Sequence, residues 1–299
     1  QLIYNPYQIM KKQLPTPKSL ACAAALLLAF SPVATASVTV LDFTDGNGTS
    51  SVDQYEGIAG GGWSSDWSVL KNSASSGSTA GSTGVTATDP LYSGGGNYLK
   101  AGFSTPAGLT GTPQWGYYRQ LDNSAIDLTQ EMTYHFYFRP ENSVADADYF
   151  IYSRVGSPAV GSDSNATWLI YNSGTTWRFS NGNGVGGFTT VDTGVEVTAG
   201  VVYEFTVGSN PVDNTYTANI SSSEGDYSSS TLNYRNTSNV EGEYLQYAIR
   251  DNDPANADEV YFSVDNIGVT QIPEANATAM LIGLLAFVVA CARRRAGRQ

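Results

Sequence analysis

The sequence predicts an all-β fold, a two-sheet antiparallel β-sandwich, from two observations. Residues 37–272 contain many short runs of alternating apolar and polar side chains, separated by turn formers such as Gly, Ser, Asn and Asp, and this is the pattern of half-buried strands. Met132, Tyr134, Phe136 and Phe138, for example, would share one face of a strand. In addition, no stretch of this region has the spacing of a long amphipathic helix.

The alternating runs give about a dozen strands. In chain order they are residues 37–43, 97–103, 115–121, 132–139, 148–155, 167–171, 175–179, 201–207, 215–221, 244–250 and 259–270. Because so many short strands in a region of this length favour two packed sheets, we expect one sandwich or jelly-roll domain over residues 37–272.

The amino-terminal end predicts a secretory signal peptide over residues 10–36. Met10 is followed by two lysines, an apolar run of about ten residues and the sequence Ala-Thr-Ala, which match the charged, apolar and cleavage regions of such leaders. Cleavage would fall between Ala36 and Ser37, and residues 1–9 would precede the natural start. We therefore expect export through the Sec pathway.

The carboxyl-terminal end predicts one transmembrane helix over residues 277–292. These 16 residues carry no charge and would form a helix roughly 24 Å long at 1.5 Å per residue. A bilayer core of about 30 Å can accept such a helix by thinning, and the arginines that follow would stay on the cytoplasmic side. A buried core helix is the alternative, but such a helix normally has a polar face. We expect an anchor in the inner membrane.

A tripeptide before this helix and a basic end after it complete a recognisable tail. The residues are Pro273, Glu274, Ala275, Arg293, Arg294 and Arg295. Together with the apolar helix they resemble the PEP-CTERM sorting signal of bacterial surface proteins, except that Ala275 stands where proline is usual. The resemblance implies an exosortase-type membrane transpeptidase as a partner, and a final place at the cell surface or in the extracellular matrix.

The residues between the two ends form a strongly acidic region without cysteine. Both cysteines, Cys22 and Cys291, lie outside residues 37–272, so this region has no disulfide and no thiol nucleophile. It contains eight basic and 26 acidic residues, a net charge near −18. This charge argues against a nucleic acid partner, whose phosphates need basic side chains. Calcium, neutral glycans or polycationic surfaces fit better, and the alternative is that the charge serves solubility alone.

Four short sequences spread over residues 37–272 resemble strands of the concanavalin-like (laminin-G-like) lectin and glucanase sandwiches. They are residues 41–46 (LDFTDG), 96–99 (GNYL), 197–205 (VTAGVVYEF) and 264–267 (VDNI). The resemblance implies a carbohydrate-binding sandwich. It leaves open a polysaccharide-degrading enzyme of the same fold, a glycoside hydrolase or lyase.

The last expected strand contains a change of phase. Val260, Phe262 and Val264 are apolar at even positions, and Ile267 and Val269 at odd ones, which predicts a β-bulge between the two sets.

The resemblance to concanavalin-like sandwiches also implies a structural calcium site. It would be formed by Asp265 of the bulge with Asp42 or Asp45 of the first strand, since calcium prefers hard oxygen ligands. The alternative is a solvated aspartate in a bulge.

Few residues suggest catalysis. His135 is the only histidine, and its place in the middle of a strand favours a structural role over a catalytic triad. The glycines at positions 182, 184 and 187 match a phosphate-binding count, but no helix pattern follows them, so we expect a hairpin loop. The Glu-x-Asp-x-x-Glu motif of glucanases with this fold is absent.

The tryptophans suggest binding instead. Trp63 and Trp67 lie in a Gly/Ser-rich stretch and are our candidates for an exposed platform on which a sugar could stack. Trp168 and Trp177 lie in strand patterns and are expected in the core. The sequence thus predicts a non-catalytic, exported surface or exopolysaccharide-associated protein that binds glycan, with the polysaccharide-degrading enzyme as the alternative.

Overall fold

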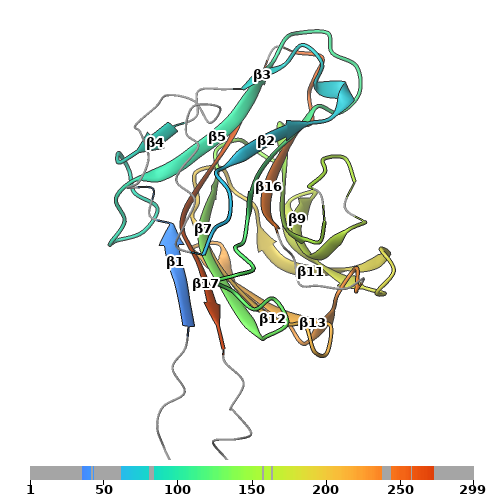
Figure 1. The fold of residues 1–299 in the computed structure, drawn as a ribbon. Coiled ribbons are helices and arrows are strands. Elements are labelled where there is room, and N and C mark those ends of the chain that lie inside the picture. The colour runs from blue at the N-terminus through green and yellow to red at the C-terminus, as the bar shows by residue number, and fades with distance from the viewer. Residues whose placement is uncertain are drawn as a thin grey trace, which may run out of the picture. The chain divides into compact units, whose positions relative to one another are not determined.

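The computed structural model describes residues 36–41, 43, 62–80, 84–156, 158–162, 164–237, 244–256 and 258–272. These residues form two antiparallel sheets, as the sequence predicted (Figure 1). Within these ranges, one element is not a strand: a single 3₁₀ turn, η1 (Ser73–Ser75). The all-β prediction is therefore confirmed for the described part of the chain.

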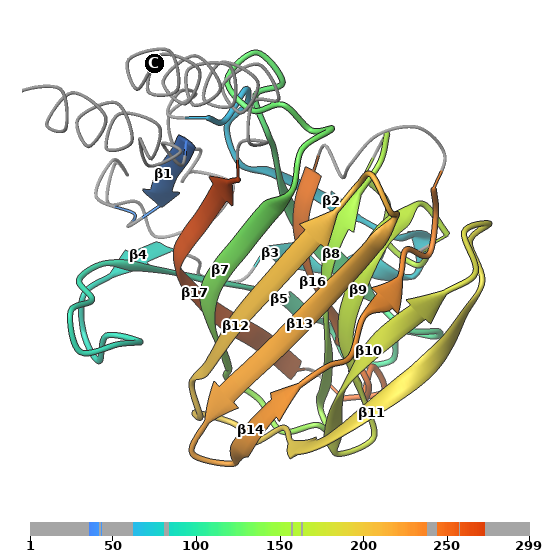
Figure 2. The same cartoon turned by 90° about the horizontal axis from the view of Figure 1, so that it is seen from below.

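The larger sheet has ten strands. Seven follow one another in the order β14 (Gly225–Ser228), β13 (Thr215–Ser222), β12 (Tyr203–Asn210), β7 (Met132–Pro140), β17 (Asp258–Gln271), β5 (Tyr98–Thr105) and β3 (Thr79–Ala80). The other three pair at its sides: β1 (Ala36–Leu41) with β17, β15 (Leu232–Asn233) with β13, and β4 (Gly84–Thr86) with β5. Figure 2 shows β14, β13, β12, β7 and β17 side by side.

The smaller sheet has seven strands. Their order is β11 (Phe188–Glu196), β10 (Thr176–Gly182), β9 (Ala166–Ser173), β8 (Ala147–Arg154), β16 (Tyr244–Asp251), β6 (Gln114–Gln120) and β2 (Ser68–Lys71). The glycines at positions 182, 184 and 187 lie at the β10–β11 hairpin, as expected.

The core lies between the sheets and is built from the alternating side chains of both. Tyr247 of β16 contacts Phe136, Phe138 and Phe262 of the ten-stranded sheet, with ring centroids 5.6, 6.2 and 6.0 Å apart. Trp177 of β10 packs edge-on against Phe138 at 5.8 Å. Burying such large apolar surfaces is the main favourable contribution to folding.

The predicted bulge in β17 is confirmed. The pairing of β17 with β7 shifts register between Asp265 and Gly268, and Asn266 there has a positive φ of 50°, a conformation that Asn tolerates better than most residues. The bulge is also where β17 changes neighbour on its other side. Residues before it pair with β5, and residues from Ile267 onward pair with β1.

Most of the two predicted targeting ends lies outside the described residues: the leader up to residue 35, the tripeptide at 273–275, the apolar helix at 277–292 and the arginines at 293–295. The predicted cleavage residues, Ala36 and Ser37, are the first two residues of β1 and pair with Gln271 and Thr270. In the part of the chain that is described, no helix is long and apolar enough to cross a membrane. The described strands begin at Ala36 and end at Gln271, and these two residues are paired.

Candidate functional site

Trp63 and Trp67 do not form the exposed platform that we expected. Their relative exposures are 1% and 5%. The guanidinium of Arg119 lies 5.3 Å from the Trp63 ring, and the Trp67 ring lies 6.4 Å from Phe43 and 6.2 Å from Tyr247. The prediction was wrong because these side chains fill the core beside β6, although their backbone lies in a Gly/Ser-rich segment. Trp168 and Trp177 are fully buried, as expected.

The calcium prediction depends mainly on residues outside the description, since Asp42 and Asp45 are among those left out. Asp265 is 1% exposed and its Oδ1 accepts a hydrogen bond from the Asn266 N–H at 2.7 Å. Within the described ranges, no group of three or more His, Cys, Asp or Glu side chains is arranged to hold a metal ion. The calcium site therefore stays a prediction.

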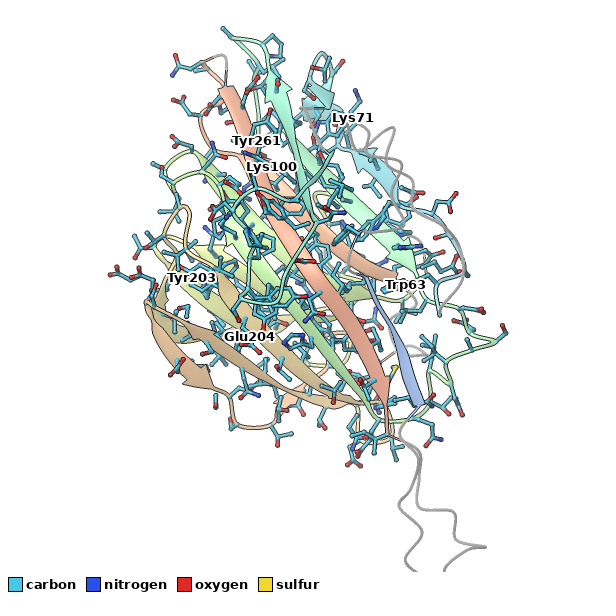
Figure 3. All side chains as sticks on the ribbon, turned by 90° about the vertical axis from the view of Figure 1, so that its left-hand side faces the viewer. Trp63, Lys71, Lys100, Tyr203, Glu204 and Tyr261 are labelled. Atoms are coloured by element: carbon cyan, nitrogen blue, oxygen red, sulfur yellow. The ribbon has the colours of Figure 1, made fainter. Side chains whose placement is uncertain are left out.

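The outer face of the ten-stranded sheet carries an ionic network in which basic side chains are paired with neighbouring carboxylates. Arg139 of β7 binds the Asp89 carboxylate at 2.8 Å and Glu141 at 2.9 Å. Lys100 of β5 lies 3.9 Å from Glu141 and 5.2 Å from the Tyr261 ring; Lys100 and Tyr261 are labelled on this face in Figure 3. We call this surface the ionic face.

His135 belongs to the same face. Its Nε2 is 2.9 Å from Oε1 of Glu204 on the neighbouring strand, and its ring packs edge-on against Tyr137 at 5.2 Å. Burial, followed by the negative charge of Glu204, raises the pKa of Tyr137, so this phenol stays protonated at neutral pH. These contacts give His135 a structural role, through ring packing and one hydrogen bond.

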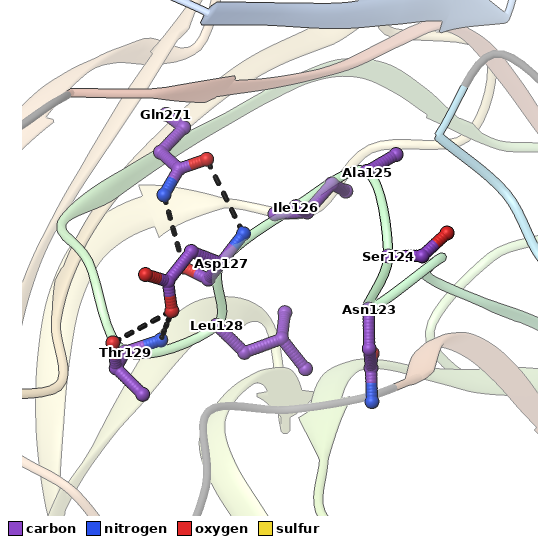
Figure 4. A pocket seen from close by; sticks show the side chains of 8 residues that line it. All are labelled: Asn123, Ser124, Ala125, Ile126, Asp127, Leu128, Thr129 and Gln271. Atoms are coloured by element: carbon purple, nitrogen blue, oxygen red, sulfur yellow. Dashed lines mark hydrogen bonds between the residues drawn. The ribbon is translucent and has the colours of Figure 1, made fainter.

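An open pocket of about 420 Å³ lies in the loop after β6 (Figure 4). It is lined by residues 123–129 and by Gln271, whose side chain binds the Asp127 backbone at N–H and C=O. The Asp127 carboxylate accepts hydrogen bonds from the Thr129 hydroxyl at 2.6 Å and its N–H at 3.0 Å, which lower the pKa of Asp127. These polar groups hold the turn itself and do not converge on the pocket.

The outer face of the seven-stranded sheet carries a second apolar cluster, separate from the core. Its aromatic members are Phe150 and Tyr152 of β8, Tyr171 of β9 and Phe188 of β11. Phe150 is cross-strand partner of Tyr171, with ring planes within 3° and centroids 6.4 Å apart. Tyr152 lies 6.1 Å from Phe150 along the strand, and Phe188 lies 6.0 Å from Tyr171. We call this surface the aromatic face.

Alternation explains why these rings point outward. In β8, Tyr149 and Ile151 enter the core, so Phe150 and Tyr152 must lie on the other side of the sheet. In β9, Trp168 and Ile170 enter the core and Tyr171 is left outside. Phe150 and Phe188 remain partly exposed, and Tyr152 and Tyr171 are 2% and 9% exposed.

Four arginines border the rings of the aromatic face. Guanidinium groups lie 4.1 Å from Tyr152 (Arg154), 5.2 Å from Phe150 (Arg250) and 4.3 Å from Phe188 (Arg235). Arg178 of β10 is the cross-strand partner of Tyr171. Such cation–π contacts stabilise by about 0.5–2 kcal/mol each, and they keep the guanidinium groups at the ring row.

The loop between β8 and β9 covers one side of the aromatic face. The Gln246 side chain of β16 donates to the Ala159 carbonyl at 3.0 Å, and the Gly161 N–H donates to the Gln114 side chain at 3.0 Å. Gly116 of β6 leaves room for this loop, because a Cβ there would lie 2.7 Å from Val160. The loop therefore lies over β6 and β16, and the partly exposed rings are on the β8 to β11 side.

Sequence reasoning missed the aromatic face, although a signal was present. Residues 149–152 (YFIY) and 168–171 (WLIY) are apolar at consecutive positions, so both sides of these strands carry apolar side chains. A strand with two apolar faces has one face in the core and needs a second cover or a ligand on the other.

Comparisons with known proteins show likeness of fold only. No protein-family model matches the sequence, and no curated protein is similar to it. Similar solved structures include a protein of unknown function from Shewanella oneidensis MR-1 (12% identity, TM-score 0.47, 86% of this chain and 95% of that one). A GH131 β-glucanase catalytic domain from Podospora anserina has 14% identity and a TM-score of 0.45, covering 64% and 79%. Lectin II from Ulex europaeus has 11% identity and a TM-score of 0.37, and the match covers 68% of this chain and 93% of the lectin.

Some matched chains are much longer than the part that is similar. The chain spans 17% of a sialidase and 51% of the binding domain of a botulinum neurotoxin. With TM-scores below 0.5, these similarities assign neither a family nor an activity to the protein.

Proposed function

We propose that the protein is an exported, non-catalytic glycan-binding protein of the cell surface, and that the aromatic face is its binding surface. The observation that carries the proposal is the row Phe150–Tyr171–Phe188, on the outside of a sheet and bordered by arginines. A core does not need these rings, since the opposite sides of β8 and β9 already supply it.

The chemistry of this face suits a sugar chain. Pyranose rings present C–H groups on their faces, and these pack well against aromatic side chains. Guanidinium groups offer several N–H donors in a fixed plane, which can bind ring hydroxyls or carboxylates. The two partly exposed rings, Phe150 and Phe188, lie 6.4 and 6.0 Å from Tyr171 between them, so each can contact a different sugar unit.

A binding role fits the acids of this face better than hydrolysis does. Glycoside hydrolysis needs two carboxyl groups about 5–10 Å apart, one of them available as an acid. The described carboxylates beside the rings are Asp148, which forms an ion pair with Arg250, and Asp192, which lies 3.5 Å from Arg178. Both carboxylates already interact with a guanidinium group of the same face, and the Asp148 side chain is almost fully buried, so neither is placed to protonate a sugar oxygen.

The two ends of the sequence support the proposed place of action. A leader cleaved between Ala36 and Ser37 would export the sandwich. The tail at residues 273–299 resembles a PEP-CTERM signal and would retain it at the membrane until an exosortase-type enzyme processes it. In this arrangement the sandwich meets the extracellular polysaccharide.

The test is binding of the purified protein to an array of polysaccharides, with measurement of reducing ends in the same samples. We expect retention by at least one polysaccharide and no release of reducing ends. Phe150→Ala and Phe188→Ala should each weaken binding about tenfold, or about 1.4 kcal/mol. The matched control is Tyr261→Ala, which removes a partly exposed ring from the ionic face and should change binding less than about twofold.

Two results would contradict the proposal. Release of reducing ends would make the protein an enzyme. Binding that is lost equally in Tyr261→Ala and Phe150→Ala would place the surface elsewhere. Melting curves of both variants show whether a loss of binding reflects a loss of folded protein.

A further inference from the structure

The basic residues of the sandwich are concentrated on the aromatic face. Residues 37–272 contain eight basic residues among 26 acidic ones. Arg154, Arg178, Arg235 and Arg250, half of the eight, border the ring row. Arg154 and Arg235 are buried, at 0% and 6% exposure, and bind loop carbonyls. The cations of this face that a ligand can meet are therefore Arg178 and Arg250, in a domain with a net charge near −18.

Two of these arginines keep enough exposure to reach a ligand. The side chains of Arg178 and Arg250 are 30% and 36% exposed. The pair of Arg178 with Asp192, 3.5 Å apart and with Asp192 53% exposed, is of the surface kind that contributes about 0–1 kcal/mol. A ligand carboxylate can therefore compete for Arg178 at small cost.

Asp192 does not depend on Arg178. Its Oδ1 accepts the Gly194 N–H at 3.0 Å, and this hydrogen bond is the largest cause of the lowered pKa of Asp192, ahead of the charge of Arg178. The carboxylate thus keeps its own stabilising contact when the guanidinium turns toward a ligand. Arg178 is the cross-strand neighbour of the Tyr171 ring, so its guanidinium lies beside the surface on which a sugar would stack.

We infer that the ligand of the aromatic face is an anionic polysaccharide, one that carries a carboxylate on its sugar rings, with Arg178 as its charge partner and Arg250, which also holds the buried Asp148, beside it. This inference rests on the proposed function and specifies its ligand class. The rest of the acidic domain repels a polyanion, so such a chain can approach closely only where the arginines gather. The rings then contact the sugar faces. The guanidinium groups bind the carboxylates of the sugars through two parallel N–H···O hydrogen bonds, a geometry that suits guanidinium and carboxylate alike.

The experiment compares two polymers that differ only in charge, polygalacturonate and its carboxyl-reduced neutral form. We expect the protein to bind polygalacturonate at least tenfold more tightly than the reduced polymer. Arg178→Gln should lower the affinity for polygalacturonate about fivefold and leave binding of the reduced polymer within twofold. Lys100→Gln is the matched control, since it removes the same charge from the ionic face, where Lys100 is 40% exposed, and should change neither.

The outcomes separate this inference from the proposed function. Equal binding of both polymers, or a preference for the neutral one, overturns the anionic ligand and leaves glycan binding standing. Binding of neither polymer, with binding of no other polysaccharide on the array, overturns both. An equal loss of polygalacturonate binding in Lys100→Gln and Arg178→Gln would show that net charge matters and the aromatic face does not, which also overturns the inference.

Discussion

Arg139 on the ionic face and Arg178 on the aromatic face are both outward-pointing arginines of strands that are paired on both sides, yet their surroundings differ. Arg139 is 7% exposed and contacts Asp89, Glu141 and the Tyr98 hydroxyl. Burial alone would lower the pKa of Arg139, but the hydrogen bond and charge of Glu141 raise it instead. Arg178 is 30% exposed and meets one carboxylate at 3.5 Å. A buried, saturated cation supports the fold, whereas a partly exposed one beside aromatic rings remains able to bind a ligand.

The largest effect on stability is expected when each of these two arginines is replaced in turn. Arg139→Met should lower the free energy of unfolding by about 3 kcal/mol, because it leaves Glu141 (17% exposed) without its closest counter-charge. The melting temperature should fall by about 6–12 °C for a domain of this size. Arg178→Met, the matched change on the aromatic face, should cost about 1 kcal/mol or less.

Thermal and urea unfolding of the two variants measure both values. Equal destabilisation by the two substitutions would contradict the distinction between a structural and a ligand-directed arginine. A stable Arg139→Met protein would show that the ionic face does not support the fold.

Two glycines sharpen the comparison further. A Cβ at Gly102, in β5 on the ionic face, would lie 2.0 Å from the Val260 carbonyl oxygen and 2.8 Å from Tyr261 Cα, which are backbone atoms of β17. A Cβ at Gly116, beneath the β8–β9 loop, would lie 2.7 Å from the ends of the Gln246 and Val160 side chains. Backbone in a sheet cannot move aside as side chains can.

We therefore expect Gly102→Ala to cost about 1–3 kcal/mol and Gly116→Ala less than about 1 kcal/mol. Gly96→Ala is a control, because nothing lies within 4 Å of its Cβ position. Chemical denaturation of the three variants gives the order directly. If Gly116→Ala is the more damaging change, the β8–β9 loop packs on β6 as rigidly as the strands of the ten-stranded sheet pack on one another.

Alternation predicted the central strands well and the edges poorly, for a physical reason. The runs at 132–139 and 201–207 correspond to β7 and β12 because each has one apolar face against the core. The edge strand β11 (FTTVDTGVE) was missed, since most of its side chains are exposed or partly exposed and show no apolar alternation. Edge strands take their conformation from the neighbouring strand more than from their own pattern.

The same contrast, between features set by local sequence and features set by strand pairing, holds for the candidate sites. The bulge at Asp265 was predictable because a change of apolar phase is a local signal. The burial of Trp63 and the row formed by Phe150, Tyr171 and Phe188 were not, since both depend on which strands become neighbours. Tyr171 and Phe150 are 21 positions apart in the sequence, and only the pairing of β8 with β9 brings the two rings together.

The smallest expected effect is the pH dependence of stability that Asp192, on the aromatic face, contributes. The hydrogen bond from Gly194, with a contribution from Arg178, holds the pKa of Asp192 below its ordinary value of 3.8. A lowered pKa in the folded state means that the unfolded chain binds more protons in this range, so the stabilisation is present above about pH 4 and is lost as the pH falls through the lowered pKa. Asp192→Asn should therefore lower stability slightly at pH 7, by less than about 1 kcal/mol because solvent screens this exposed group, and the difference from the unsubstituted protein should shrink as the pH falls through the lowered pKa. Urea unfolding at pH 7 and in acid measures it, and a difference that stays the same in acid would show that Asp192 acts through its turn geometry and not through its charge.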